Sequence, residues 1–363
     1  MSLTDDYLNY AERRHGMDHT LYPWSDLFER PQVTWPNGAR VALWVMPILQ
    51  WFPLDMSAKP FRAPGGLTMP FPDFRHYTNR DYGNRVGIFR ILNVLDELGI
   101  PASVALNAAV AERYPALLEA LTQRKLEIVA HGQDMGQVHH SGLSREEEER
   151  LIVGALDTLR SASGQAVTGW LSPGRAQSAN TPSLLAAHGV TYSCDFANDD
   201  LPFAMDTGSG KRDAGAGKHY AMPLAYETDD RVVMQDFHHT ELDWLTQVKD
   251  RFDVLYRESA QYGGRVMSVP LHAWVSGVPY RIGVVREALK YMLNHDGVWA
   301  ARGDEILAAF ERSQAKVQGG GVPQPQPHAN GPSQPNAQPN AQANAQPNAQ
   351  PNSQRDSQGD AHA

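Results

Sequence analysis

Two histidines carry the first chemical signal in the sequence. His131 follows the apolar run 128–130 and precedes a glycine, and His272 follows the apolar run 266–271. Each therefore comes directly after a segment that we expect to be a buried strand. An imidazole titrates near neutral pH, so in such a place it can transfer a proton or bind a metal ion. We expect His131 and His272 to form the centre of an active site.

Other polar side chains leave the remaining expected strands. Because the carboxyl ends of parallel strands meet at one rim of an α/β barrel, these side chains should gather there. Asp195 is expected to act in catalysis, as a base or as a group that orients a histidine. The expected substrate contacts are Gln50, Trp51, Asn107, Arg175 and Glu227.

The types of these side chains suit an amide-like substrate. Gln50 and Asn107 can hydrogen-bond amide groups, and Trp51 can form an apolar wall. The forked donors of Arg175 suit a carboxylate or a polarised carbonyl, although a structural ion pair of Arg175 is equally compatible with the sequence. If a metal ion is bound, the candidate ligands are His131, His139 and His140.

The elements that must position these residues alternate along the chain. Short β-branched, apolar runs fall at 40–48, 102–106, 126–130, 167–171, 190–194, 219–224, 266–271 and 297–299. Helical apolar spacing or capping residues fall between them, at 88–98, 109–123, 144–159, 181–188, 241–262 and 282–293. Loops are expected at 53–80 and 198–217. This alternation predicts an α/β fold, a (β/α) barrel of about seven parallel strands. A doubly wound open sheet is the alternative, but no Gly-rich turn follows the first strand.

Composition divides the chain and limits its partners. We expect a lead-in segment at 1–35, a barrel domain at 36–313 and a disordered tail at 314–363, where Pro, Asn, Gln and Ala repeat. The formal net charge is -9 with no basic cluster, so a nucleic-acid partner is not expected. No apolar run approaches the ~20 residues that cross a bilayer. With one cysteine and no basic, apolar leader, the sequence predicts a cytoplasmic protein.

Several motifs resemble those of the polysaccharide deacetylase superfamily, and most of all its branch of allantoinases and cyclic imide hydrolases. The similarity runs from about residue 36 to residue 309, and its motifs are the segments 81–87, 127–132, 252–256, 267–272 and 296–299. The resemblance implies a distorted (β/α) barrel with its active site at the carboxyl ends of the strands. It also implies hydrolysis of a carbon–nitrogen bond and assembly into homo-oligomers.

The sequence departs from the metal-binding pattern of that superfamily. Its members place two aspartates after the first strand, and Gln50 and Trp51 stand at the corresponding positions. Its second motif has two histidines four residues apart. His131 stands at the first of these positions, and Met135 stands at the second. The late catalytic histidine of the superfamily matches His272. The segment 172–175 and Asp195 match later motifs more loosely.

We therefore expect a hydrolase that opens a small cyclic amide, imide or ureide with an activated water. His272 would act as general acid or base, and His131 would orient the water or hold a metal ion. No cofactor is required in this interpretation; the alternative is a single divalent metal such as zinc. Two other functions stay open: a metal-dependent deacetylase of an N-acetylated substrate, and a non-catalytic protein that binds a small molecule.

Overall fold

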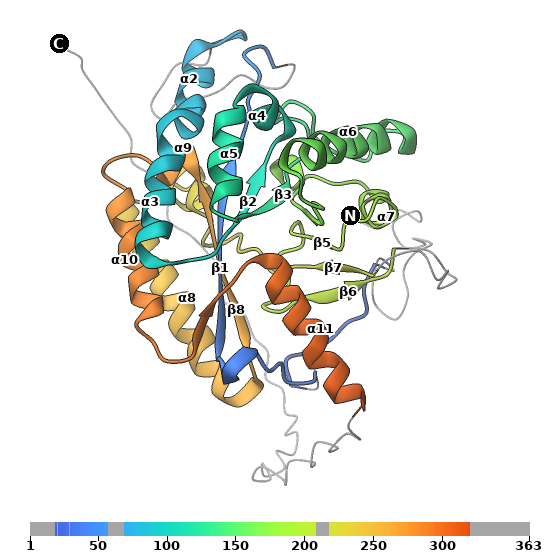
Figure 1. The fold of residues 1–363 in the computed structure, drawn as a ribbon, viewed down its shortest axis with the longest axis vertical. Helices are drawn as coiled ribbons and strands as arrows, with labels where there is room; N and C mark the ends of the chain where they lie inside the picture. The colour runs from blue at the N-terminus through green and yellow to red at the C-terminus, as the bar shows by residue number, and fades with distance from the viewer. Residues whose placement is uncertain (1–18, 20, 29, 57–68, 208–217, 320–363) are drawn as a thin grey trace, which may run out of the picture. The chain divides into compact units, whose positions relative to one another are not determined.

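The computed structural model describes residues 19, 21–28, 30–56, 69–207 and 218–319 (Figure 1). The chain divides into two units, residues 1–322 and 323–363. The second unit lies outside the described residues, as does most of the expected tail. All the strands and helices of the described residues belong to the first unit. No helix among the described residues is long and apolar enough to cross a membrane.

A curled, mostly parallel sheet forms the centre of this unit. Eight strands follow one another in the order β6-β7-β5-β4-β3-β2-β1-β8, and β9 pairs with the start of β1. Only β6 and β7 pair antiparallel among the described strands. The bounds are β1 Val41–Leu49, β2 Ser103–Leu106, β3 Glu127–Ala130, β4 Gly169–Trp170, β5 Tyr192–Ser193, β6 Phe203–Met205, β7 His219–Ala221, β8 Arg265–His272 and β9 Val298–Ala300. The expected distorted (β/α) barrel is confirmed.

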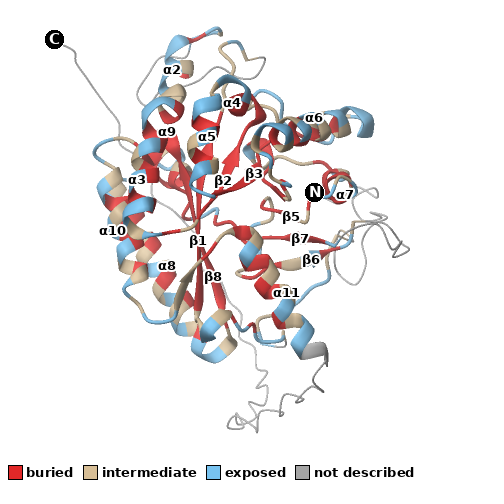
Figure 2. Ribbon diagram, viewed as in Figure 1, coloured by how far each residue is buried: buried red, intermediate tan, exposed pale blue. Residues whose placement is uncertain are grey.

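Helices follow most of the strands and cover the outer face of the sheet (Figures 1 and 2). They present buried faces to the strands and exposed faces to solvent. The bounds are α2 Phe74–Tyr82, the π-helix η2 Gly83–Gly87, α3 Ile88–Leu98, α4 Ala108–Arg113, α5 Pro115–Gln123, α6 Arg145–Ser163, α7 Thr181–Ala187, η4 Val232–Asp236, α8 Glu241–Tyr262, α9 Ala273–Ser276, α10 Ile282–Leu293 and α11 Gly303–Gly319.

The ends of these helices follow from local side chains. The expected capping box of α6 is present, with the Ser144 hydroxyl accepting from the Glu147 N–H. Gly99 ends α3 in the left-handed conformation, with φ 64°, which a glycine adopts at little cost.

Four segments differ from the sequence expectation. The expected loop 53–80 contains α2, which Asp73 caps by accepting from the Arg75 N–H. The expected helix 109–123 is interrupted before Pro115, since a residue that precedes proline disfavours helical geometry. The expected loop 198–217 contains β6, and its residues 208–217 lie outside the described residues. Helix α11 extends past residue 314, where the tail is expected to begin.

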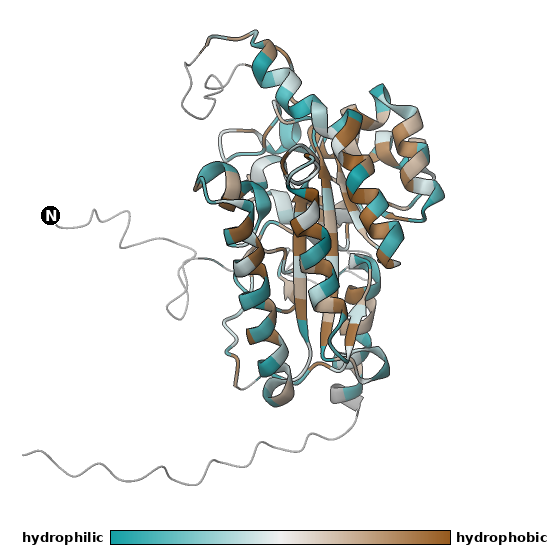
Figure 3. Cartoon of the chain, turned by 90° about the vertical axis from the view of Figure 1, so that its left-hand side faces the viewer, coloured by the Kyte–Doolittle hydropathy of each residue, from teal (hydrophilic) through white to brown (hydrophobic). Residues whose placement is uncertain are grey.

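Strand β1 is buried over all nine residues. Seen from the side of the helices, the central strands of the sheet are mostly hydrophobic (Figure 3). The side chains of Val41, Leu43 and Val45 join the apolar layer under the outer helices. The alternate side chains of Ala42, Trp44, Met46 and Ile48 join a second cluster inside the curl, together with Tyr192 of β5 and Phe310 of α11. The even-numbered positions of β1 therefore face the interior, and Gln50 continues this series beyond the strand end.

The open side of the curl is held by contacts of the loops and the lead-in. The Val266 N–H donates to the Asp200 carbonyl at 3.2 Å. The Ser268 hydroxyl donates to the Pro223 carbonyl at 2.7 Å. From the lead-in, the Trp35 indole N–H donates to the Arg265 carbonyl at 3.0 Å. The first two contacts attach β8 to segments that follow β5 and β7, and the third attaches it to the lead-in. In the described part of the chain, β8 shares no ladder with β5 or β7.

Helix η2 packs directly on α9 through glycine. A Cβ atom added at Gly87 would overlap the Ala273 carbonyl oxygen, although the backbone of Gly87 has ordinary helical angles. A side chain at Gly277 would overlap the same oxygen and Gly87 itself. Because α9 begins directly after His272, this close contact fixes the end of β8.

We expect Gly87→Ala to lower the free energy of unfolding by about 2 kcal/mol or more, because the methyl group has no space. Gly154→Ala is the matched control, since Gly154 lies in α6 and an added Cβ meets nothing within 4 Å. That control should be neutral or stabilising by up to about 1 kcal/mol. Urea unfolding of both variants measures the effect. Equal stabilities of the two variants would contradict the described packing.

Candidate active site

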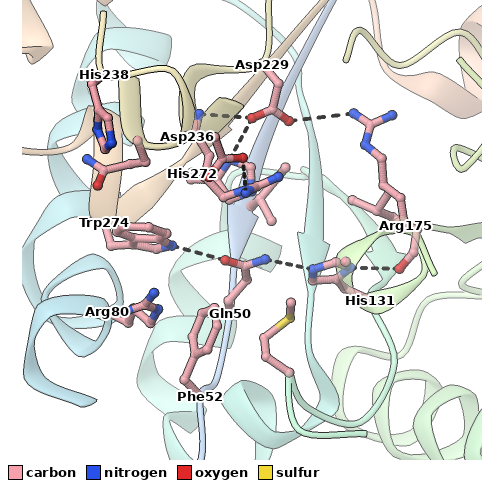
Figure 4. Close-up of a pocket in the computed structure, with 16 residues that line it drawn as sticks. Gln50, Phe52, Arg80, His131, Arg175, Asp229, Asp236, His238, His272 and Trp274 are labelled. Atoms are coloured by element: carbon pink, nitrogen blue, oxygen red, sulfur yellow. Dashed lines mark hydrogen bonds and ion pairs between the residues drawn. The ribbon is translucent and has the colours of Figure 1, made fainter. Parts of the chain in front are cut away.

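A pocket of about 710 Å³ opens at the carboxyl ends of the strands (Figure 4). Four of the residues expected from the sequence line it: Gln50, His131, Arg175 and His272. The other lining side chains include Phe52, Arg80, Met135, Asp229, Arg231, Asp236, His238 and Trp274. The registers of β1, β3 and β8 bring their terminal residues to one level, since Ile48 pairs with His272.

His272 is held by a buried carboxylate. Its Nδ1 lies 2.8 Å from Asp230 Oδ1, and its backbone N–H donates to the same side chain at 2.9 Å. Ser276, in α9, donates its hydroxyl to Asp230 Oδ2 at 2.5 Å. A carboxylate can only accept, so Nδ1 carries the hydrogen and Nε2 is the ring nitrogen left for the pocket. A histidine oriented in this way can take a proton through Nε2.

Asp229 lies beside this pair and faces the pocket (Figure 4). One of its oxygens is 3.5 Å from His272 Nδ1, and the other is 3.6 Å from the Arg175 guanidinium. Arg175 also donates to the backbone carbonyls of Leu224 and Ala225, at 2.9 and 2.7 Å. Arg175 therefore joins the end of β4 to the segment after β7 and places a positive charge at the pocket wall.

A chain of three side chains forms the opposite wall (Figure 4). The Trp274 indole N–H donates to Gln50 Oε1 at 3.1 Å, which fixes the orientation of the Gln50 amide. Gln50 Nε2 lies 3.2 Å from His131 Nε2, and His131 Nδ1 lies 2.7 Å from the Leu171 carbonyl. Since a carbonyl can only accept, His131 carries its hydrogen on Nδ1 and accepts from Gln50 through Nε2.

This arrangement favours the neutral form of His131. The ring is 2% exposed, and burial lowers its pKa to about 4; the charge of His272 acts in the same direction. His131 therefore stays unprotonated at neutral pH and is not the proton donor of the site.

Comparison with known proteins agrees with this geometry. The model of the polysaccharide deacetylase family matches residues 73–193, which run from the cap of α2 to β5. The chain is therefore similar to the polysaccharide deacetylase family over this part of the barrel. This family of hydrolases includes enzymes that cleave carbon–nitrogen bonds, and the resemblance seen in the sequence is confirmed.

Three relatives illustrate the similarity. A Schizosaccharomyces pombe protein named as a candidate polysaccharide deacetylase is 26% identical over 300 residues, covering 76% of this chain and 92% of the relative. The peptidoglycan deacetylase of Helicobacter pylori is 23% identical over 254 residues, covering 63% and 85%. The crystal structure of PuuE allantoinase is 26% identical with a TM-score of 0.70, covering 80% and 98%.

The metal site that the polysaccharide deacetylase superfamily implies does not fit the residues at its place. The ring nitrogen of His131 that would bind a metal ion accepts the Gln50 N–H instead. Met135 lines the pocket where the second histidine of the motif would stand, and methionine is not among the usual zinc ligands of proteins, which are cysteine, histidine, aspartate and glutamate. No carboxylate follows β1 directly, because Gln50 and Trp51 take that place.

A different group in the described residues could hold a metal ion. Asp229, Asp230 and His272 each offer a ligand atom, and these atoms lie within 4.8 Å of one another. In the structure His272 Nδ1 hydrogen-bonds Asp230 and lies 3.5 Å from an Asp229 oxygen. Metal binding there would require loss of the Nδ1 hydrogen, so the same three residues can serve either as a hydrogen-bonded base or as ligands.

The remaining residues expected from the sequence lie outside the pocket lining. Trp51 directly follows Gln50, so its side chain points to the opposite side of the chain. It packs near Tyr77 and Tyr114, whose ring centroids are 5.5 and 6.1 Å from its own. Glu227 is exposed and lies 3.7 Å from Arg251. Both were expected to contact substrate, and neither is among the side chains that face the pocket.

Asn107 and Asp195 stabilise backbone beneath the rim. Asn107 accepts the Trp51 N–H at 2.8 Å and donates to the His131 carbonyl. Asp195 accepts the backbone N–H and the hydroxyl of Ser172, both at 2.8 Å, and burial raises its pKa to about 6. Each side chain thus connects two strand ends, and neither lines the pocket.

The expected metal candidates are not brought together. The buried His139 lies 3.2 Å from Glu148 of α6, and His140 is exposed and accepts the Gly142 N–H. Neither is part of the one group of potential ligands found among the described residues.

Sequence reasoning missed Asp229 and Asp230. They were overlooked because β7 ends at Ala221 and the chain runs without regular structure to residue 229 before η4 begins. A signal was present, since the two acidic residues are separated from the apolar run 232–234 by Arg231 alone, and acidic residues next to a buried segment are rarely buried without a partner. Trp274 and Arg80 were missed because they are not at strand ends.

The pKa of His131 predicts a pH dependence of stability. Its folded value of about 4 lies below the unfolded value of 6.5, so its contribution is present above pH 6.5 and is lost as the pH falls toward 4. Between these values we expect the free energy of unfolding to fall by up to about 3 kcal/mol more in the wild type than in His131→Asn. Unfolding curves across this pH range, with the exposed His238→Asn as control, provide the measurement. Parallel pH profiles of wild type and His131→Asn would refute the assignment.

Proposed function

We propose that the protein hydrolyses a non-peptide carbon–nitrogen bond, most specifically by opening the ring of a small cyclic amide, imide or ureide. The observation that carries the proposal is the buried Asp230–His272 pair, which leaves His272 Nε2 for the pocket. The similarity to PuuE allantoinase supports the choice of a cyclic substrate.

In this proposal His272 is the general base. Its Nε2 accepts a proton from a water molecule as the water oxygen attacks the carbonyl carbon. Asp230 stabilises the imidazolium that forms, through the hydrogen bond to Nδ1. When the tetrahedral intermediate collapses, the carbon–nitrogen bond breaks and the same proton passes from Nε2 to the leaving nitrogen.

Gln50 is the best placed donor for the developing oxyanion. Trp274 fixes its amide, one N–H is directed to His131, and the second N–H remains for a ligand. A fixed donor costs no reorganisation when negative charge develops on the carbonyl oxygen. His131 is in this view a positioning residue, because it acts through Gln50. The positive charge of Arg175 adds to the stabilisation.

We further propose that the reaction needs no metal ion. His131 and Gln50 satisfy each other, and the proton on His272 Nδ1 is part of the proposed mechanism. A metal-dependent deacetylase of an N-acetylated substrate is the alternative, favoured by the names of the relatives and by the potential ligands Asp229, Asp230 and His272. A cytoplasmic location and a homo-oligomeric state remain predictions from the sequence.

The substrate class and the base can be tested together. Wild-type protein is assayed on allantoin, hydantoins, dihydropyrimidines, cyclic imides and N-acetylated chitooligosaccharides. On the preferred substrate we expect His272→Ala and Asp230→Asn to lower kcat by at least about 100-fold, because the base is lost or misoriented. His140→Ala, on an exposed histidine, serves as control. Unchanged kcat in His272→Ala would sink the assignment of the base, and release of acetate alone would favour the deacetylase.

Removal of metal tests the second part of the proposal. Protein purified without chelators should contain less than about a tenth of an equivalent of zinc, and dialysis against EDTA should leave kcat unchanged. Elemental analysis and the kinetic assay are run on the same samples. Loss of activity on dialysis, with recovery on adding zinc, would support the metal-dependent alternative instead.

A further inference from the structure

We propose that the outer part of the pocket is a carboxylate-binding subsite built on Arg80, so that the substrate carries an acidic group next to its scissile carbon–nitrogen bond. This inference rests on the proposed function, and it names the substrate class of the same site.

Arg80 reaches the pocket from the last turn of α2 (Figure 4). Its guanidinium carbon lies 4.7 Å from the centre of the Phe52 ring and 4.9 Å from the centre of the Trp274 ring. Two aromatic faces limit the movement of a planar guanidinium and orient its edge, which suits a bidentate acceptor. A carboxylate has the shape that such an edge binds.

The backbone under Arg80 is fixed as well. A Cβ at Gly83, three residues later, would lie 2.6 Å from the Trp274 backbone nitrogen, so the end of α2 is in close contact with α9. Arg80 Nη1 also donates to the His76 carbonyl at 3.4 Å, within α2. The guanidinium is therefore held in place before a ligand arrives, which reduces the entropy lost on binding.

The charges around the pocket favour an anion. Three arginines line it, whereas only two carboxylates of the described residues do, those of Asp229 and Asp236. Arg175 lies 3.6 Å from Asp229, and Arg231 lies 2.6 Å from Asp236. Burial lowers the pKa of Arg80 to about 10, and the charge of Arg231 acts in the same direction, so Arg80 stays protonated at neutral pH beside a second cation. An anion bound at Arg80 would be attracted by both positive charges.

Arg80 lies near the proposed reaction centre, so one small molecule could contact both. Trp274 contacts Arg80 through its ring face and Gln50 through its indole N–H. The proposed oxyanion donor and the proposed anion subsite are thus separated by one tryptophan side chain. A carboxylate attached to the ring, or one methylene away from it, can reach Arg80 while the carbonyl lies at Gln50.

Matched substrate pairs test the subsite. Dihydroorotate is dihydrouracil with a ring carboxylate, and hydantoin-5-acetate is hydantoin with a carboxymethyl group. We expect kcat/KM to be higher for the acid of each pair. In Arg80→Met the ratio of acid to neutral kcat/KM should fall by about 10- to 100-fold, mainly through KM of the acid, because a charged hydrogen-bonding partner is lost. Arg80→Lys should retain part of the preference.

Arg113→Met is a matched control. Arg113 also stacks on an indole, with its guanidinium 4.3 Å from the Trp51 ring, but it lies outside the pocket lining. The ratio of acid to neutral should not change in this variant. Circular dichroism and thermal unfolding of Arg80→Met exclude misfolding as the cause of a changed ratio.

The outcomes separate the subsite from the proposed function. Turnover of neutral substrates that depends on His272, without preference for the acids, overturns the subsite and leaves the proposed function intact. If no pair is hydrolysed, calorimetric titration of dihydroorotate and dihydrouracil into wild type and Arg80→Met decides the subsite alone. Stronger binding of the acid that disappears in Arg80→Met supports it, and equal or absent binding of the two overturns it.

Discussion

The register between β1 and β8 is the constraint on which the rest of the site depends. Eight consecutive residue pairs join these strands, and the last places Ile48 beside His272. A slip of one residue would turn His272 toward the helices and Gln50 away from the pocket. The register is enforced by the core, because alternate side chains of β1 must enter two different apolar clusters. Packing of large apolar side chains such as Trp44 thus determines where the polar groups meet.

Burial determines the chemistry that those polar groups can perform. Removal from water holds His131 neutral by lowering its pKa, and an amide rather than a carboxylate stands beside it. The buried carboxylate is found instead on the other side of the pocket, where Asp230 accepts hydrogen bonds from four donor groups, two of them on His272. The chain has the fold of the polysaccharide deacetylases, but the buried carboxylate of its pocket belongs to Asp230, beside His272, and does not follow β1.

Much of the fold and part of the site could be predicted from the sequence. Apolar periodicity and capping residues located most strands and helices, since those signals are local, and strand ends indicated Gln50, His131, Arg175 and His272. The alternation of side chains along β1 would have predicted that Gln50 faces the pocket and Trp51 does not, because adjacent strand residues face opposite sides. Asp229, Asp230, Arg80 and Trp274 could not be placed, because the irregular run after β7 and the packing of α2 on α9 depend on contacts between distant segments.

The glycine-mediated contact of η2 with α9 has a consequence for how this protein can diverge. Gly87 and Gly277 join the helix pair to the strand that ends at His272, so this part of the pocket wall and His272 are held together. Arg80, on the last turn of α2, extends from this part of the structure into the pocket. The residue at position 80 can change through substitution while the position of His272 is preserved. The residue that would select the ligand can therefore change in evolution without a change at the proposed catalytic histidine.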